Sequence, residues 1–387
     1  MIRLKDWLSR NLIATAAVAL LVLTLAITVV VPLLNRPGDR PDPQEQIGLA
    51  WIKPVGSEAA YAGSEACKSC HPKEYESYIA SPHSHAVHLI PAGKELPEFD
   101  SHQTITDDRN NIIYSVQKGG GKNQIVATAG SHTELGEARW VFGSGTQAWT
   151  YLSQDDQKFI QLRISYYPPS KTWNFTPGSG PGAPYHEPLG DPYTPGQAAA
   201  CFGCHSTVIT GTRKKLDFDH SILTVGCESC HGPSRSHIES VQGGGASGAT
   251  GQAAIIKPPS HDGPQTMQLC GACHRVPVAV KDENASASPQ LARFPGVALP
   301  RSRCFTESSG KLSCVTCHNP HQSTVQQTEA SFDQKCINCH SKPHGTTCSN
   351  GQTSACVSCH MPVETIARKL PLRFHNHWIR KDPGALN

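Results

Sequence analysis

The sequence predicts a mostly α-helical and irregular fold with little regular secondary structure, one small antiparallel β insert and one N-terminal transmembrane helix. Of its 387 residues, 33 are Gly and 30 are Pro, while 38% are hydrophobic and only 6% are aromatic. This composition favours loops over long regular elements. It also supplies few side chains for an apolar core, so another source of buried apolar surface is expected.

A five-residue motif, C-x-x-C-H, occurs seven times and indicates that source. It is the attachment signature of a c-type haem. Two thiols at this spacing form thioethers to the haem vinyl groups, and the adjacent His is the proximal ligand of the iron. The cysteines are Cys67, Cys70, Cys201, Cys204, Cys227, Cys230, Cys270, Cys273, Cys314, Cys317, Cys336, Cys339, Cys356 and Cys359. The proximal histidines are His71, His205, His231, His274, His318, His340 and His360.

Zinc ribbons and thioredoxin-like redox pairs also contain Cys-x-x-Cys. Neither requires a His directly after the second Cys, and all seven copies have one. We therefore expect seven covalently attached haems c, whose porphyrins form much of the core of a multihaem cytochrome.

The N-terminus predicts a membrane anchor. Residues 1–10 contain three basic side chains, and an uncharged apolar run follows from Leu12 to Leu34. That run is long enough to cross a bilayer, and no clear cleavage site of a secretory signal follows it before residue 35. Residues 1–34 are predicted to be a cytoplasmic stub and an uncleaved transmembrane anchor, with the haem domain facing the periplasm or cell exterior. Residues 35–60 are expected to be a Pro-rich linker.

Residues 61–99 form the first haem segment, where the first motif is followed by Tyr75, Tyr78, Ser81 and His83. This arrangement resembles the multihaem cytochromes of the tetrahaem cytochrome c-552/4 and hydroxylamine oxidoreductase superfamily. In that superfamily, C-x-x-C-H is followed by an aromatic pair and by an S-x-H that carries a distal haem ligand. The resemblance implies that His83 is a distal ligand, with His85 as the alternative.

Residues 100–177 are predicted to be the β insert. Alternating or β-rich stretches separated by Gly-rich and Asp-Asp turns indicate a small antiparallel meander; they are Asn111–Gln117, Gln124–Ala129, Arg139–Phe142 and Lys158–Tyr167. The stretch from Phe142 to Gly178 resembles a β insert of membrane-anchored multihaem cytochromes. Its expected role is to pack over haem edges and limit access of solvent.

Residues 178–378 are expected to hold the other six haems, followed by a tail of residues 379–387. The phrase G-C-E-S-C-H-G-P with His237 after it is the second match to the same superfamily, and it implies that His237 is a distal ligand. His231 and His237 are too close in sequence to bind opposite faces of one haem easily, so His237 is expected to serve a neighbouring iron. The same argument applies to His321, after His318, and to His344, after His340.

Four further residues bear on the ligand set. His375 and His377 would point in opposite directions in an extended segment, so one of them, His377, is the expected ligand. Cys304 and Cys348 belong to no motif. In an oxidising compartment a disulfide between them is expected, with free or ligating thiols as the alternative.

The thirteen remaining His are enough to give every iron two His ligands, while the chain has only three Met. Because His/Met ligation raises the potential of a haem, the haems are expected to have low potentials. We predict a membrane-anchored heptahaem cytochrome that transfers electrons by haem-to-haem hopping. Its donor would be a redox partner protein or a quinol-oxidising complex.

The alternative is an oxidoreductase that acts on a small nitrogen or sulfur compound at one open-coordinate haem. Multihaem nitrite reductases usually replace the motif His of the catalytic haem by Lys, and the chain contains no C-x-x-C-K. The formal net charge is +3, and no basic patch in the sequence suggests binding to nucleic acid.

Overall fold

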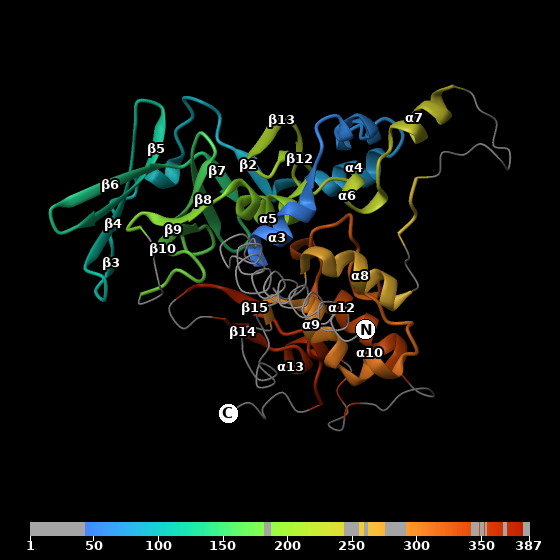
Figure 1. The fold of residues 1–387 in the computed structure, drawn as a ribbon. Helices are drawn as coiled ribbons and strands as arrows, with labels where there is room; N and C mark the ends of the chain where they lie inside the picture. Colours follow the sequence, from blue (N-terminus) through green and yellow to red (C-terminus); the bar gives the residue numbers. More distant parts are fainter. Residues whose placement is uncertain are drawn as a thin grey trace, which may run out of the picture.

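The computed structural model describes residues 43–181, 187–243, 255–258, 262–274, 292–341, 348, 352, 354–366 and 370–381. Strands gather in the first half of this part of the chain, and short helices occupy the second half (Figure 1). The upper part of the view contains the larger sheets together with α4 and α6, and the lower part contains the helices from α8 onwards and the pair β14–β15.

The expectation of a mostly α-helical fold is wrong, because the described residues form four β-sheets. That expectation relied on the low apolar content of the whole chain, which does not apply to every part of it. The apolar and aromatic residues are concentrated between residues 86 and 223, where they are numerous enough to build β-sheets with cores of side chains.

The first part of the β insert is a four-stranded antiparallel meander. Its strands are β3 (Ile105–Asp107), β4 (Ile112–Gly119), β5 (Lys122–Ala129) and β6 (His132–Glu137), in the order β3-β4-β5-β6. Side chains alternate across the faces of a strand, and Ile112, Tyr114 and Val116 all point to the buried side of β4. Gly120 and Gly121 both have positive φ and make a two-residue hairpin turn of the kind that joins twisted strands. The strands predicted at 111–117 and 124–129 are confirmed.

A second sheet has the order β10-β9-β8-β7-β2, with β11 also paired to β9. Its strands are β2 (Val87–Leu89), β7 (Trp140–Phe142), β8 (Trp149–Asp155), β9 (Lys158–Tyr167), β10 (Thr172–Phe175) and β11 (Gly190–Tyr193). The predicted strands at 139–142 and 158–167 are confirmed. However, β2 comes from the first haem segment and β11 from the Pro/Gly connector, so backbone pairing ties the insert to the haem segments on both sides of it.

A third sheet consists of β1 (Ile52–Lys53), β12 (Ser206–Thr212) and β13 (Lys215–Leu223), of which β12 directly follows the second motif. The sequence analysis missed it. Next to it, helix α3 (Pro43–Trp51) packs on helix α5 (Pro195–His205). The close approach requires a Gly within the motif, because a Cβ on Gly203 would overlap the ring of Trp51. Thr194 caps α5 by a reciprocal capping box with Gln197.

Aromatic rings fill two clusters in this half of the molecule. In one, Trp173 lies 5.0 Å from Phe99 and 5.4 Å from Tyr151 between ring centroids. In the other, Phe202 of α5 lies 5.0 Å from Trp140 and 4.9 Å from Phe142. The second cluster packs the second motif against the sheet of the insert.

The rest of the chain consists of short helices and one hairpin. The helices are α4 (Pro72–Ile79), α6 (Glu228–His231), α7 (Arg235–Gln242), α8 (Gly263–His274), α9 (Pro295–Ala298), α10 (Arg303–Glu307), α11 (Cys314–Cys317), α12 (Glu329–His340) and α13 (Cys356–His360). The hairpin pairs β14 (Val363–Thr365) with β15 (Arg373–His375). Single 3-10 turns lie at Ser57–Ala60, Ser64–Cys67, Pro82–His85, Pro97–Asp100, Leu299–Arg301 and Thr324–Gln326.

The predicted transmembrane helix has no counterpart in the described structure. None of the described helices has both the length and the apolar character needed to cross a membrane. The apolar run from Leu12 to Leu34 lies outside the described residues, as does the predicted distal ligand His344.

Candidate haem sites

The seven motifs are here called sites 1 to 7 in chain order, and sites 2 to 7 share a local geometry. At sites 2, 4 and 6 the motif is the C-terminal end of a helix, α5, α8 or α12. At sites 3, 5 and 7 the motif nearly coincides with a one-turn helix, α6, α11 or α13. In a helical turn, residues three apart lie on the same face. The two thiols of each of these motifs are therefore held on one side, as attachment to a single porphyrin requires.

Several motif and distal histidines are surrounded by protein atoms, although part of each ring remains accessible to solvent. His274 is exposed, yet burial among surrounding atoms lowers its pKa. His377 is half-exposed, and burial lowers its pKa to about 4. Burial likewise lowers the pKa of His83 and of His205. The surrounding protein therefore favours the neutral imidazole, which is the form that binds a metal.

Three pairs of imidazole rings carry the site assignment. The ring centroids of His83 and His274, of His231 and His321, and of His318 and His377 are each 6.1 Å apart. An imidazole nitrogen binds a metal at about 2 Å, so two rings on opposite sides of one metal have centroids roughly 6 Å apart. In each pair one ring belongs to a motif and the other does not. The residues present therefore fit two axial ligands of one haem iron at sites 4, 3 and 5.

Backbone carbonyls orient several of these rings. The Nδ1 atom of His205 lies 2.8 Å from the carbonyl oxygen of Ala86, that of His231 lies 3.0 Å from Ile256, and that of His360 lies 2.6 Å from Arg380. A ring that donates from Nδ1 to a carbonyl presents Nε2 as its free nitrogen, and metal-binding His are commonly held in this way. The three rings are thus prepared to bind iron through Nε2.

The predicted distal histidines fall into two groups: some lie against a motif His and others do not. His83, His321 and His377 each lie against a motif His. His237 lies in the first turn of α7, and its ring contacts no other His ring among the described residues. His85, the alternative to His83, is 3.0 Å from the carbonyl oxygen of Ile79 through Nε2. The sequence predicts these residues as ligands, and the structure shows which motif His lies against His83, His321 and His377.

The first cysteines of different motifs are in contact. The thiols of Cys67 and Cys227 are hydrogen-bonded to each other, and this bond lowers the pKa of Cys227 to about 6. Cys270 and Cys314 form a second such pair, in which the hydrogen bond lowers the pKa of Cys270 to about 7. Cys336 and Cys356 form a third. Sites 1 and 3, 4 and 5, and 6 and 7 are therefore direct neighbours.

Two buried carboxylates link the same neighbours, and the sequence analysis missed both. Glu228, inside the motif of site 3, accepts hydrogen bonds from the backbone N–H groups of Ala62 and Gly63, each at 2.9 Å. It also accepts from Ser234 Oγ at 2.6 Å. Asp333, three residues before the motif of site 6, accepts from the backbone N–H groups of Ala355 and Val357 at site 7.

The predicted disulfide between Cys304 and Cys348 is not present, since both residues carry free thiols. Cys304 lies in α10, close to Cys317 of site 5 and Cys339 of site 6. Cys339 helps to raise the pKa of Cys304, and Cys304 helps to raise the pKa of Cys317. Burial is the main reason that the pKa of Cys304 is raised, so its thiol is protonated at neutral pH. Among the described residues, no group of three or more His, Cys, Asp or Glu side chains is arranged to hold a bare metal ion.

A comparison with family models agrees with a haem protein. Residues 66–123 and 189–232 match the family of cytochrome c554 and c-prime. The interruption, residues 124–188, coincides with most of the β insert. No curated protein matches the chain. The solved structure of the outer cell wall cytochrome OcwA is 14% identical, with a TM-score of 0.45, and the alignment covers 83% of this chain and 80% of that one.

The two matched segments contain sites 1, 2 and 3 with their complete C-x-x-C-H motifs. This match supports a c-type cytochrome with covalently attached haem, a class of protein that transfers electrons.

Proposed function

We propose that this protein is a heptahaem electron carrier, attached to a membrane, that passes electrons from haem to haem between a donor and an acceptor. The observation that carries the proposal is the set of three imidazole pairs, because each joins a motif His to a second His from a distant segment. An iron with two His ligands has no position left for a substrate.

The residues of the chain have distinct tasks in this function. Each pair of motif cysteines would hold one haem by two thioethers, and the motif His would bind its iron. When bound, the haem supplies reversible one-electron chemistry. The second His at sites 3, 4 and 5 would bind the same iron as the motif His and, being His rather than Met, would keep its potential low. The contacts between first cysteines bring neighbouring sites together, which short electron-transfer steps require.

The number of haems can be measured directly. A pyridine haemochrome assay combined with the intact mass of the purified protein is expected to give seven covalently bound haems per chain. Replacing Cys204 with Ala removes one thioether at site 2 and should change the haemochrome spectrum. An unchanged spectrum would remove site 2 from the count.

The coordination of the irons tests the choice between carrier and enzyme. In the oxidised protein, the EPR spectrum should contain only low-spin ferric signals, which added nitrite, hydroxylamine or cyanide leaves unmoved. A high-spin signal that shifts when one of these ligands is added would contradict the carrier. It would favour an oxidoreductase that acts on a small nitrogen or sulfur compound at an open iron.

The place of the protein in the cell is part of the proposal. Residues 1–34 would attach the chain to the cytoplasmic membrane, with the haem-binding part in the periplasm or at the cell exterior. The apolar run from Leu12 to Leu34 and the three basic residues before it support this arrangement. A quinol-oxidising complex or another redox protein would be the partner on the membrane side. Protease treatment of spheroplasts should digest the haem-binding part, whereas protection of that part would contradict the orientation.

A further inference from the structure

We infer that residues 375–380 form a strap that fixes two haem sites at once, sites 5 and 7, and that the buried hydroxyl of Ser302 positions this strap. The inference rests on the proposed electron-carrier function and adds what holds the second ligand of one iron in place. Because the strap provides a ligand for one site and a hydrogen-bond acceptor for the other, a single change at Ser302 should alter both sites.

One part of the strap faces site 5. The ring of His377 lies 6.1 Å from the ring of His318, measured between centroids. The Nδ1 atom of His377 is 3.1 Å from the carbonyl oxygen of His375. A ring that donates from Nδ1 to a carbonyl presents Nε2 as its free nitrogen, and metal-binding His are commonly held in this way. The strap itself therefore orients His377 to be the second ligand at site 5.

Both ends of the strap contact site 7. At its start, the Nδ1 atom of His375 is 2.7 Å from the carbonyl oxygen of Met361, which directly follows the motif of site 7. At its end, the Nδ1 atom of His360 is 2.6 Å from the carbonyl oxygen of Arg380. The backbone N–H of Arg380 in turn donates to the carbonyl oxygen of His360 at 3.4 Å. Arg380 lies three residues after His377, so one short segment contacts the histidines of two sites.

Ser302 binds the strap between these contacts. Its side chain is fully buried, with 0% exposure. Its Oγ donates a hydrogen bond to the carbonyl oxygen of His377 at 3.1 Å and accepts one from the backbone N–H of Ile379 at 2.8 Å. Ser302 directly precedes α10 and belongs to no haem motif. Because leaving a buried N–H without an acceptor is unfavourable, loss of this hydroxyl should release the strap at His377.

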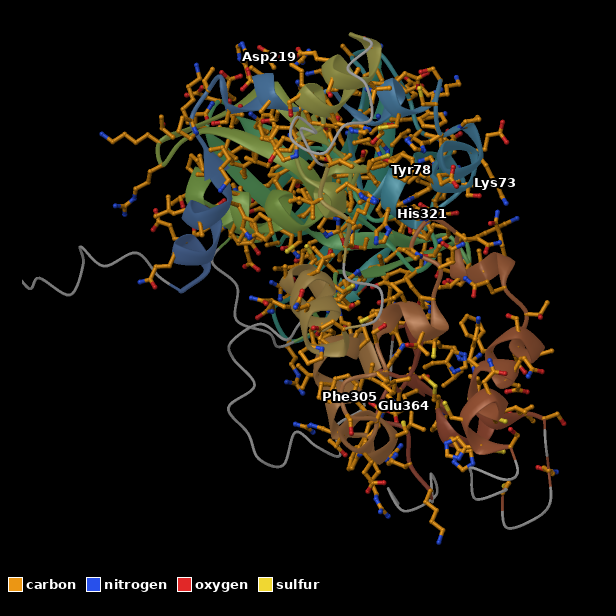
Figure 2. All side chains as sticks on the ribbon, turned by 90° about the vertical axis from the view of Figure 1, so that its right-hand side faces the viewer. Lys73, Tyr78, Asp219, Phe305, His321 and Glu364 are labelled. Carbon is orange, nitrogen blue, oxygen red and sulfur yellow. The ribbon has the colours of Figure 1, made fainter. Side chains whose placement is uncertain are left out.

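A second buried polar side chain, Asn376, supports the same arrangement. It is 2% exposed, and its Oδ1 accepts from the backbone N–H of Trp378 at 2.9 Å. Its Nδ2 donates to Glu364 Oε1 at 2.8 Å, and its backbone N–H donates to the carbonyl oxygen of Pro362 at 3.0 Å. Figure 2 shows Glu364 of β14 in the lower part of the molecule, at the level of Phe305 of α10. The strap is thus held between the hairpin that follows site 7 and the start of α10.

The same spacing occurs in the first haem segment. The ring of His83 lies 6.1 Å from the ring of His274 of site 4. Three residues after His83, the carbonyl oxygen of Ala86 lies 2.8 Å from the Nδ1 atom of His205 of site 2. The backbone N–H of Gly143, next to β7, donates to the same carbonyl at 2.8 Å. Two separate segments therefore combine, at the same separation, a ring for one site with a carbonyl for another.

Ser302→Ala in the holoprotein tests the strap, since it leaves every C-x-x-C-H motif intact. Once the strap is released, His377 should leave the iron of site 5, and the EPR spectrum of the oxidised protein should gain one high-spin ferric signal per chain that shifts when cyanide is added. At site 7, a weaker contact between Arg380 and His360 makes the imidazole a less basic ligand. The haem of site 7 should then be reduced about tenfold more easily, which is a midpoint potential higher by about 59 mV for one electron. A redox titration measures this shift.

Three further variants separate the role of Ser302 from that of the ligand. His377→Ala removes the ring but keeps the contact between Ser302 and Ile379, so it should give the high-spin signal without the shift in potential at site 7. Ser302→Thr keeps the hydroxyl and should keep the low-spin spectrum. Ser165→Ala removes an equally buried hydroxyl from β9 of the insert, where it contacts Thr176, and should change neither site.

Each result has a separate meaning. If Ser302→Ala opens no iron while His377→Ala opens one, the strap is overturned and the proposed electron carrier stands. The strap also fails if Ser302→Ala opens an iron but titrates like His377→Ala, or if Ser165→Ala behaves like Ser302→Ala. If His377→Ala opens no iron although seven haems are attached, the ligand pair of site 5 fails, and with it part of the basis of the proposed function.

A pair of shortened chains gives the same test if Ser302→Ala yields no holoprotein. A chain that ends at Trp378 keeps Ser302 and His377 but lacks the N–H group of Ile379 and the carbonyl group of Arg380. It should show both the high-spin signal and the higher potential. A chain that ends at residue 381 keeps all the contacts of the strap and should show neither change. Equal behaviour of the two shortened chains would contradict the strap.

Discussion

Residues 86–223 bury large aromatic side chains, whereas the described residues between 226 and 381 bury none. The first region has Trp140, Trp173, Tyr114, Tyr151 and Phe159 at 2% exposure or less. In the second region the buried apolar side chains are only Ala292, Ala298, Leu299, Val357, Ile366 and Leu372. Yet the second region holds five of the seven haem sites. The comparison indicates that one chain uses side chains as the core of one region and haems as the core of the other.

The energetics follow from this difference. Burying a large apolar side chain stabilises a fold by about 1.5–3 kcal/mol, and residues 86–223 gain this many times. The helical region has little of that gain and a comparable cost of chain ordering. Its stability must come from the bound haem, which contributes both apolar surface and covalent and axial bonds to distant parts of the chain.

The largest expected effect comes from withholding haem. In a chain produced without haem attachment, residues 226–381 should lose most of their protection against hydrogen exchange and proteolysis. Residues 100–177 should keep theirs, because their core contains only side chains. Mass spectrometry of exchanged peptides measures both regions in one sample. Equal loss of protection in the two regions would contradict the comparison.

A change inside the aromatic core should destabilise the β insert and leave the haem sites intact. Trp173 contacts Phe99 and Tyr151, and its Nε1 donates a hydrogen bond to the carbonyl oxygen of Glu98 at 3.0 Å. Trp173→Ala should lower the free energy of unfolding of the β insert by about 3–5 kcal/mol. The haem absorption spectrum should stay unchanged.

The control for Trp173→Ala is Ile113→Ala, since Ile113 on β4 is 50% exposed. Its effect should remain within about 0.5 kcal/mol in denaturant titrations followed by tryptophan fluorescence. A loss of haem signals in Trp173→Ala before the insert unfolds would show that the two regions do not have separate cores.

The smallest expected effect concerns a link between sites. In Glu228→Gln, the new amide N–H₂ group would replace an oxygen that accepts from the backbone N–H of Gly63. The loss should be about 1–3 kcal/mol, the usual cost of leaving a buried donor unsatisfied. The amides of residues 62 and 63 should exchange faster, while the haem count stays the same.

Glu76→Gln, on the exposed face of α4, is the matched control for Glu228→Gln and should leave these amides unchanged. If the two variants behave alike, Glu228 does not hold site 1 against site 3.

The local chemistry of the chain could be read from the sequence. The C-x-x-C-H motif lies within one turn of backbone, so its spacing alone determines that two thiols and an imidazole meet one haem. The alternation of Ile112, Tyr114 and Val116 determines a strand for a similar reason, because the period of two is a property of the strand itself. A single composition figure for the whole chain was misleading, since it averaged two regions with different cores.

Contacts between distant segments were decided only by the tertiary structure. The argument that a His soon after a motif serves a neighbouring haem applied equally to His237 and His321, and only folding brought His321 to His231. Nor could spacing show that β2 and β11 join the sheet of the insert, or that Cys304 lies near Cys317 and Cys339 rather than Cys348. By itself the sequence determined where each haem is attached, because that chemistry is local. Which haem sites are neighbours depends on the packing of the whole chain.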